Sequence, residues 1–207
     1  MRVTGPGIVL EGLLGIPERP VGLVAFAHGS GSGRFSPRNQ FVARHLQAGG
    51  FVTLLLDLLT PDEADDRRKV FDIDLLADRL LMALAWLRRQ TPTAALKVGL
   101  FGASTGAGAA LQAAAREPSS VAAVVSRGGR PDLAGPYLGR VTAPTLLLVG
   151  GEDGPVITLN EEAMARLTCP KELVIIPDAT HLFEEPGTLE QVAEQAKRWF
   201  RRFLSDT

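Results

Sequence analysis

The sequence predicts an α/β fold in which helices flank a mostly parallel, doubly wound sheet of about seven strands. Two features predict this class. Short apolar runs alternate with helix-like stretches along all 207 residues, and such alternation produces right-handed βαβ crossovers. Some of the runs are apolar throughout, such as 21–27, which is typical of strands buried on both faces of a parallel sheet.

Strands are expected where short apolar runs end at turn residues. The first, 9–14, ends at Gly15-Ile16-Pro17, and the second, 21–27, leads into a loop rich in glycine and serine. The other predicted strands have the same leucine-rich or β-branched composition. They cover 51–56, 96–101, 121–125, 145–149 and 173–176.

Helices are expected where apolar residues recur every three or four positions. Phe41, Val42 and Leu46 define the first helix, which Gly49-Gly50 ends. The highly charged stretch 62–69 is expected to be a solvated loop or the start of a helix. The remaining predicted helices cover 75–89, 107–115, 159–167 and 191–203. No insertion is long enough for a large lid over the carboxyl ends of the strands, where ligands bind in such sheets.

Length and composition narrow the class of protein. A chain of 207 residues and 22.1 kDa fits one domain with a sizeable core, so a single domain is expected over 1–207. The formal net charge of −1 gives no electrostatic reason to expect nucleic acid or an anionic membrane as a partner. The excess of arginine over lysine, with abundant alanine and glycine, suggests a bacterial source.

Cysteine usage and the N-terminus indicate the compartment. The single cysteine, Cys169, excludes an internal disulfide and a thiolate metal cluster, and it suits a reducing environment. No apolar segment has the form of a signal peptide or the length of a membrane span. We therefore expect a cytoplasmic protein.

The segment Gly102-Ala103-Ser104-Thr105-Gly106 predicts a nucleophile. It lies between a β-like run and an alanine-rich helix, which is the context of the Gly-x-Ser-x-Gly nucleophile elbow. Such a serine adopts a strained backbone conformation, and glycines are needed on both sides because side chains there would collide with neighbouring elements. The hydroxyl of Ser104 is then exposed above the edge of the sheet.

A serine nucleophile needs a base, and the chain has three histidines. His181 follows the last predicted strand, which is where hydrolases of this chain order carry the base. His45 lies on a helix and is interpreted as structural, since an isolated helical histidine rarely acts in catalysis. His28 ends a strand and is interpreted as a residue that braces the following loop.

The acid that orients His181 is expected to be Asp153, which follows the strand at 145–149. Asp132 follows the preceding strand and is the main competitor. Glu152 and Asp178 fit turn residues or exposed charges better. A turn role is also open for Asp153 taken alone, but its register with Ser104 and His181 favours the catalytic role.

Two backbone N–H groups are expected to form an oxyanion hole. One belongs to Thr105, directly after the nucleophile, and the other to Ser30, in the loop 28–33. The glycines of this loop also suggest a phosphate site. However, the loop lacks both the spacing of the dinucleotide fingerprint and the Lys-Ser/Thr of a P-loop.

Two arginines are candidate substrate ligands. Arg127 follows a predicted strand at the functional edge, and a guanidinium there could hold a substrate carboxylate. The alternative is an ion pair with a loop carboxylate such as Asp132 or Asp57. Arg34, beyond the oxyanion loop, has the same ambiguity.

Four segments in this order carry a family resemblance: 28–30, 102–106, 151–153 and 179–183. Together they resemble an α/β-hydrolase of the dienelactone hydrolase-like group, over nearly the whole chain. The resemblance implies the α/β-hydrolase fold, a triad of Ser104, Asp153 and His181, and an ester-cleaving site without a lid. Dienelactone hydrolases proper carry a cysteine nucleophile, whereas here Ser104 stands there and Cys169 lies far away. A small-ester hydrolase is therefore expected rather than action on dienelactone.

The predicted activity is hydrolysis of small carboxylic esters through an acyl-enzyme on Ser104. We expect a small-molecule substrate, no cofactor, no metal, and no nucleic-acid or membrane partner; a homodimer stays open. The same triad could serve a thioesterase, a peptidase or a C–C hydrolase. A hydrolase-fold protein that binds a ligand without catalysis is the alternative from another class.

Overall fold

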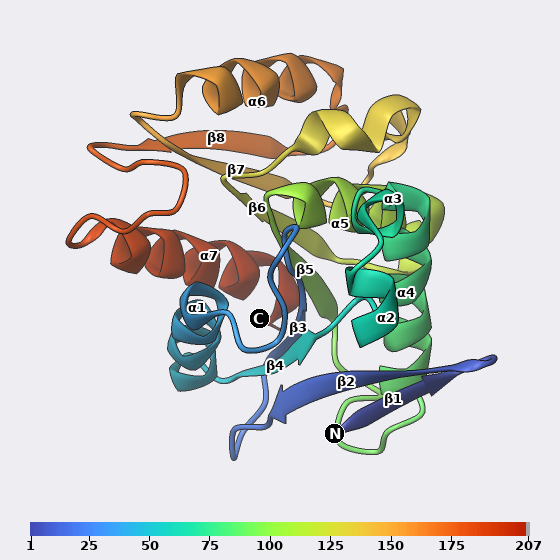
Figure 1. Cartoon of the computed structure of the whole chain (residues 1–207). Coiled ribbons are helices and arrows are strands. Elements are labelled where there is room, and N and C mark those ends of the chain that lie inside the picture. The colour runs from blue at the N-terminus through green and yellow to red at the C-terminus, as the bar shows by residue number, and fades with distance from the viewer. Residues whose placement is uncertain (206–207) are drawn as a thin grey trace.

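The computed structural model describes residues 1–205, and within them eight strands form one sheet in the order β1-β2-β4-β3-β5-β6-β7-β8 (Figure 1). The strands from β3 to β8 run parallel to one another, while at one edge β2 pairs antiparallel with β4 and β1 pairs antiparallel with β2. Their bounds are β1 Arg2–Gly5, β2 Ile8–Gly15, β3 Gly22–Ala27, β4 Phe51–Leu56, β5 Val98–Ala103, β6 Ala123–Arg127, β7 Thr145–Gly150 and β8 Lys171–Ile176. The predicted α/β class is confirmed.

The strand missing from the sequence prediction is β1. It has four residues, of which Arg2 is exposed and Val3 is fully buried. So short a strand contains no apolar run, and it forms only because it pairs with β2 in a hairpin.

Helices cover both faces of the sheet (Figure 1). On one face α1 (Pro37–Ala48) and α7 (Thr188–Leu204) pack on a core that includes Phe26, Phe101 and Phe200. On the other face α4 (Ile73–Leu87), α5 (Thr105–Arg116) and α6 (Gly154–Arg166) enclose a second core rich in leucine and alanine. The central strands are buried on both faces, which explains their continuous apolar runs.

The charged stretch predicted as a loop or helix start forms two short helices, α2 (Pro61–Ala64) and α3 (Arg67–Val70). Thr60 and Glu63 form a capping box at the start of α2. Glu63 also pairs with Arg79 of α4 at 3.1 Å, which fixes the segment to the body of the protein. A further 3-10 segment, η2 (Pro131–Arg140), was not predicted; it is interrupted by the non-helical Gly135 and contains Pro136.

The topology brings the loops that carry the candidate catalytic residues to one edge of the sheet. The loops after β3, β5, β7 and β8 carry His28, Ser104, Asp153 and His181, and all four strands are parallel. Their carboxyl ends therefore open on the same side. Within residues 1–205, no helix is both long and apolar enough to cross a membrane.

Candidate active site

Ser104 forms a sharp turn between β5 and α5. Its φ of 50° and ψ of −122° lie outside the regions that side chains favour. A Cβ on Gly102 would lie 2.5 Å from Cα of Ala107, and one on Gly106 would lie 2.2 Å from the carbonyl oxygen of Ala27. Because both neighbours are backbone atoms, only glycine fits at these two positions.

Asp153 and His181 form a hydrogen-bonded pair. Nδ1 of His181 donates to Oδ2 of Asp153 at 2.6 Å, and the Asp153 side chain is only 12% exposed. Asp153 occupies the N-cap position of α6, yet its side chain makes no cap hydrogen bond. It accepts the hydrogen bond of His181 instead. With its proton on Nδ1, the neutral ring leaves Nε2 as a proton acceptor.

The other acidic candidates are placed elsewhere. Asp132 forms a bidentate pair with Arg130, at 2.8 and 2.7 Å. Asp178 has a φ of 59°, typical of a turn residue. Of the four candidates, only Asp153 has a hydrogen bond to His181 among the described residues. Asp132, Glu152 and Asp178 have none.

Ser104 and His181 both lie close to the end of β6. The amide of Ser104 donates to the carbonyl of Arg127 at 3.3 Å, and a Cβ on the next residue, Gly128, would lie 3.5 Å from Nδ1 of His181. Within residues 1–205 no hydrogen bond joins Oγ of Ser104 to the ring, and in hydrolases without substrate this bond is often long.

The predicted oxyanion loop lies beside the nucleophile. A Cβ on Gly29 would lie 3.0 Å from Cβ of Ser104 and 3.7 Å from its Oγ. The N–H of Ser30 donates to the hydroxyl of Thr105 at 3.0 Å, so the two residues predicted to supply donors are joined. The role of the Thr105 side chain was not predicted, since the sequence pattern concerns only its backbone.

His28 braces this loop. Its Nδ1 donates to the carbonyl of Gly29 at 2.9 Å, and its Nε2 accepts the N–H of Leu58 at 3.0 Å. A carbonyl can only accept and an amide can only donate, so these two bonds require the neutral ring. Burial lowers the pKa of His28, which favours the same form, although the Gly29 carbonyl and Asp57 act in the opposite direction.

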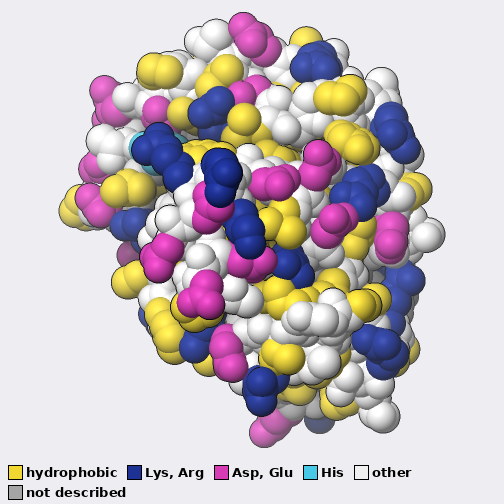
Figure 2. All heavy atoms as spheres, turned by 45° about the vertical axis from the view of Figure 1, so that its right-hand side comes forward, with side chains coloured by type: hydrophobic (Ala, Val, Ile, Leu, Met, Phe, Trp, Pro, Cys, Tyr) yellow, Lys and Arg dark blue, Asp and Glu magenta, His cyan; other side chains and the backbone are white. Residues whose placement is uncertain are grey.

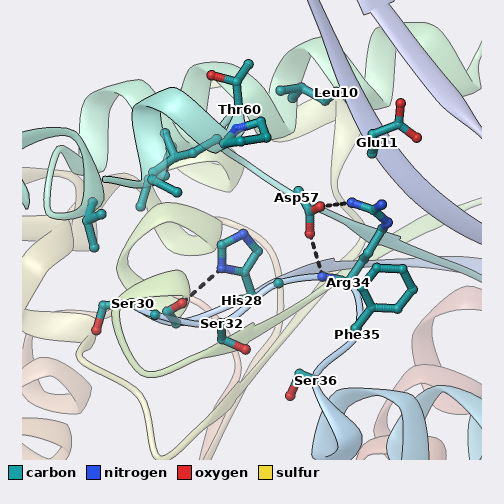
Figure 3. Close-up of a pocket in the computed structure, with 18 of the residues that line it drawn as sticks. Leu10, Glu11, His28, Ser30, Ser32, Arg34, Phe35, Ser36, Asp57 and Thr60 are labelled. Carbon is teal, nitrogen blue, oxygen red and sulfur yellow. Dashed lines mark hydrogen bonds and ion pairs between the residues drawn. The ribbon is translucent and has the colours of Figure 1, made fainter. Parts of the chain in front are cut away.

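A cavity of about 750 Å³ opens next to the oxyanion loop (Figure 3). Gly29, Ser30 and Thr105 line it on the side of the nucleophile. Arg34 lies in its wall, where its guanidinium pairs with Asp57 and its amide donates to the same carboxylate at 2.6 Å. In the view of Figure 2, which is turned by 45° from that of Figure 1, hydrophobic side chains are exposed between charged side chains of both signs. No sequence signal indicated the cavity, since its walls come from separate elements.

Among the described residues, Arg127 forms no ion pair with a loop carboxylate, which was the alternative to a substrate contact. Asp132 pairs with Arg130 and Asp57 pairs with Arg34, so neither reaches it. The residue is 7% exposed, and its Nε and Nη1 have no hydrogen-bond partner among the described residues. Its guanidinium lies 5.8 Å from the ring centre of Phe183. Burial, and the charge of Arg38, lower the pKa of Arg127 to about 10.

Two other candidates lie outside the site. His45 bonds to Glu194 at 3.1 Å and so links α1 to α7, in agreement with a structural role. Cys169 is buried, with its Sγ 3.7 Å from Oγ1 of Thr145. Within residues 1–205, no three histidine, cysteine or acidic side chains are grouped to hold a metal ion.

Comparison with known proteins agrees with this fold. Residues 10–205 match the family model described as the dienelactone hydrolase family. A crystal structure of dienelactone hydrolase from Anabaena variabilis is 56% identical, with a TM-score of 0.95 over 99% of this chain and 96% of that one. An α/β serine hydrolase without a lid from Xanthomonas campestris is 23% identical and shares the fold, with a TM-score of 0.79 over 100% and 95% of the chains.

The similar curated proteins carry a different name. Two from Mycobacterium tuberculosis strains, each named "Putative phosphoribosyl transferase", are 60% identical over 198 residues. This match covers 96% of the present chain and 44% of each relative, so the chain spans less than half of their length. The family model matches residues 10–205, nearly the whole chain, which therefore belongs to the dienelactone hydrolase family and has the α/β-hydrolase fold.

Proposed function

We propose that this hydrolase cleaves carboxylic esters through an acyl-enzyme on Ser104. The observation that carries the proposal is the 2.6 Å bond between Asp153 and His181, formed beside a serine in a strained turn. An imidazole oriented in this way presents Nε2 to the reaction, and a carboxylate stabilises the imidazolium that forms.

In the proposed reaction, Nε2 of His181 removes the proton of Ser104 while Oγ attacks the ester carbonyl. The N–H of Thr105 stabilises the negative oxygen of the tetrahedral intermediate, together with the N–H of Ser30, which exchanges the Thr105 hydroxyl for this oxygen. His181 then gives its proton to the departing alcohol. Water enters, loses a proton to His181 and attacks the acyl-enzyme, which releases the carboxylic acid and restores the hydroxyl of Ser104.

Two arginines remain proposed substrate contacts. Arg34 lines the cavity beside the oxyanion loop with its charge paired to Asp57, which supports a contact with an uncharged part of bound substrate. Arg127 lies near the nucleophile with no carboxylate partner within the described part of the chain, and unpaired buried charge is more common at functional sites than elsewhere. We also propose a cytoplasmic location and a bacterial source.

Replacement of the triad residues tests the proposal. Ser104→Ala is expected to lower kcat on short p-nitrophenyl esters about a thousandfold or more, and Asp153→Asn by about the same factor. Asp132→Asn is the matched control, because the half-exposed pair of Asp132 with Arg130 contributes little. Unchanged turnover in Ser104→Ala would exclude the acyl-enzyme.

A fluorophosphonate probe separates the proposal from a non-catalytic binding function. The probe is expected to label Ser104 in the folded wild-type protein and to leave Ser104→Ala unlabelled. Absence of labelling in folded wild type would favour the binding function instead. Thioesters assayed in parallel distinguish an esterase from a thioesterase, since both would be labelled.

A further inference from the structure

The cavity described above is lined by residues that contact or follow the nucleophile. Gly29 both lines the cavity and lies against the side chain of Ser104, where a Cβ would come within 3.7 Å of Oγ. Ser30 and Thr105, the proposed oxyanion donors, line the same wall. A group bound there would be continuous with the reacting carbonyl, so the inference that follows rests on the proposed esterase activity.

The position of His181 indicates which part of the ester enters this cavity. In the tetrahedral intermediate the leaving oxygen must lie near His181 to receive its proton, while the negative oxygen faces Ser30 and Thr105. The acyl substituent is the group left to extend away from the base. Among the described residues, those lining the cavity include neither His181 nor Asp153. The cavity is therefore on the acyl side.

The floor of the cavity is apolar. Leu10 of β2, Leu59 after β4 and Leu76 of α4 line it, and each is at most 7% exposed. Val70 of α3 and Ala64 of α2 add apolar surface. The two short helices thus form one side of a cavity of about 750 Å³, which is far more space than an acetyl or butyryl group fills.

Each charged side chain of the wall has an oppositely charged partner in the wall or beside it, although Nε of Arg38 is buried without a hydrogen-bond partner among the described residues. Arg34 pairs with Asp57, Arg38 with Glu184 at 3.1 Å and Glu11 with Arg2 at 3.8 Å. The ring of His28 is neutral, because both of its nitrogens are held by backbone groups. The wall accordingly offers no unpaired charge, among the residues described, to hold an ionised acyl group.

We infer that the cavity binds the acyl part of the substrate and selects an uncharged, apolar acyl group of aryl size. Phe35 provides a further contact for a ring. It lines the cavity, is 64% exposed, and has the Arg34 guanidinium 4.4 Å from its ring centre. An aromatic face fixed in this way and open to solvent can stack on an acyl ring.

Three esters with the same p-nitrophenyl leaving group test the inference: the acetate, the phenylpropanoate and the monoanionic hemisuccinate. We expect kcat/KM to be at least about tenfold higher for the phenylpropanoate than for the acetate, because the ring buries apolar surface. The hemisuccinate is expected to react no better than the acetate. A preference for the acetate or the hemisuccinate would overturn the inference while leaving the esterase intact.

Two variants locate the selectivity in the cavity. Ala64→Trp fills it from an exposed position on α2 and is expected to remove most of the preference for the phenylpropanoate. Ala165→Trp, at an exposed position on α6, is the matched control that should keep the preference. Equal preference in both tryptophan variants would show that the acyl group binds elsewhere.

The second pair tests the ring contact. Phe35→Ala is expected to lower kcat/KM for the phenylpropanoate about tenfold, with a smaller loss on the acetate. Phe71→Ala is its control, because Phe71 is also exposed and lies beside an arginine, 5.5 Å from Arg67, but is not among the residues lining the cavity.

If no ester reacts and Ser104 is not labelled by the fluorophosphonate, the proposed function itself fails.

Discussion

The backbone N–H of Ser30 donates to the hydroxyl of Thr105 across 3.0 Å, which joins the two residues that we propose as oxyanion donors. One residue follows β3 and the other begins α5, so the bond fixes the loop after β3 against the nucleophile turn. The hydrogen bonds of His28 hold the same loop from the side of Leu58. Both contacts hold the loop in place before substrate arrives, but the single N–H of Ser30 must turn from the Thr105 hydroxyl to the oxyanion when the intermediate forms.

Removal of the Thr105 hydroxyl is expected to slow catalysis without loss of the fold. Thr105→Val keeps the shape and the backbone N–H but releases the loop of Ser30, so kcat on p-nitrophenyl acetate should fall about tenfold. KM should change less than kcat. Thr105→Ser retains the hydroxyl and should restore most of the rate, whereas a valine variant as fast as wild type would argue against this positioning role.

The turn glycines are expected to tolerate no side chain. Gly106→Ala places a methyl group 2.2 Å from the carbonyl oxygen of Ala27, and we expect it to lower the free energy of unfolding by at least about 3 kcal/mol. Gly154→Ala is the control, because nothing lies within 4 Å of its Cβ position at the start of α6. That variant should be stabilised by about 0.5 kcal/mol. Urea unfolding measures both, and equal effects would contradict the steric argument.

His28 should make the fold sensitive to mild acid. Burial lowers the pKa of His28 below its ordinary value of 6.5, so between that value and the folded pKa the unfolded chain binds more protons. The contribution of His28 to stability is therefore present above 6.5 and is lost as the pH falls through the folded pKa.

The variant His28→Gln isolates this effect. Its side-chain oxygen can still accept the N–H of Leu58 but does not titrate. Urea unfolding at about pH 7.5 and about pH 5.5 should show a smaller loss of stability in the variant than in wild type. An equal loss in both proteins would assign the acid sensitivity to other groups.

The buried, unpaired charge of Arg127 is expected to lower the free energy of unfolding. Burial lowers the pKa of Arg127 from its ordinary value to about 10, which corresponds to a penalty of about 3 kcal/mol on the charged form in the fold. Arg127→Met replaces the unpaired charge with an apolar side chain of similar length and is expected to raise the free energy of unfolding by about 1–3 kcal/mol. Chemical denaturation tests this, and a less stable variant would contradict it. A parallel fall in kcat/KM would support the proposed substrate contact.

Most of the secondary structure could be predicted because its signals are local. The strand 51–56 was predicted with the bounds that β4 has, and the turn at Ser104 follows from the two glycines that flank it. The order Ser104, Asp153, His181 along the chain, each after a parallel strand, was enough to predict that their loops share one edge. β1 was missed because four residues carry no periodicity and gain stability only from pairing with β2.

The sequence alone thus determined the α/β class and the strained turn at Ser104, since strand burial and backbone sterics are encoded by neighbouring residues. Only the tertiary structure decided which charges are compensated and what surrounds the reacting carbonyl. Asp57 pairs with Arg34 rather than with Arg127, and Leu10, Leu59 and Leu76 meet in one cavity from three separate segments. Such contacts depend on packing between elements distant in the chain, and no local pattern specifies them.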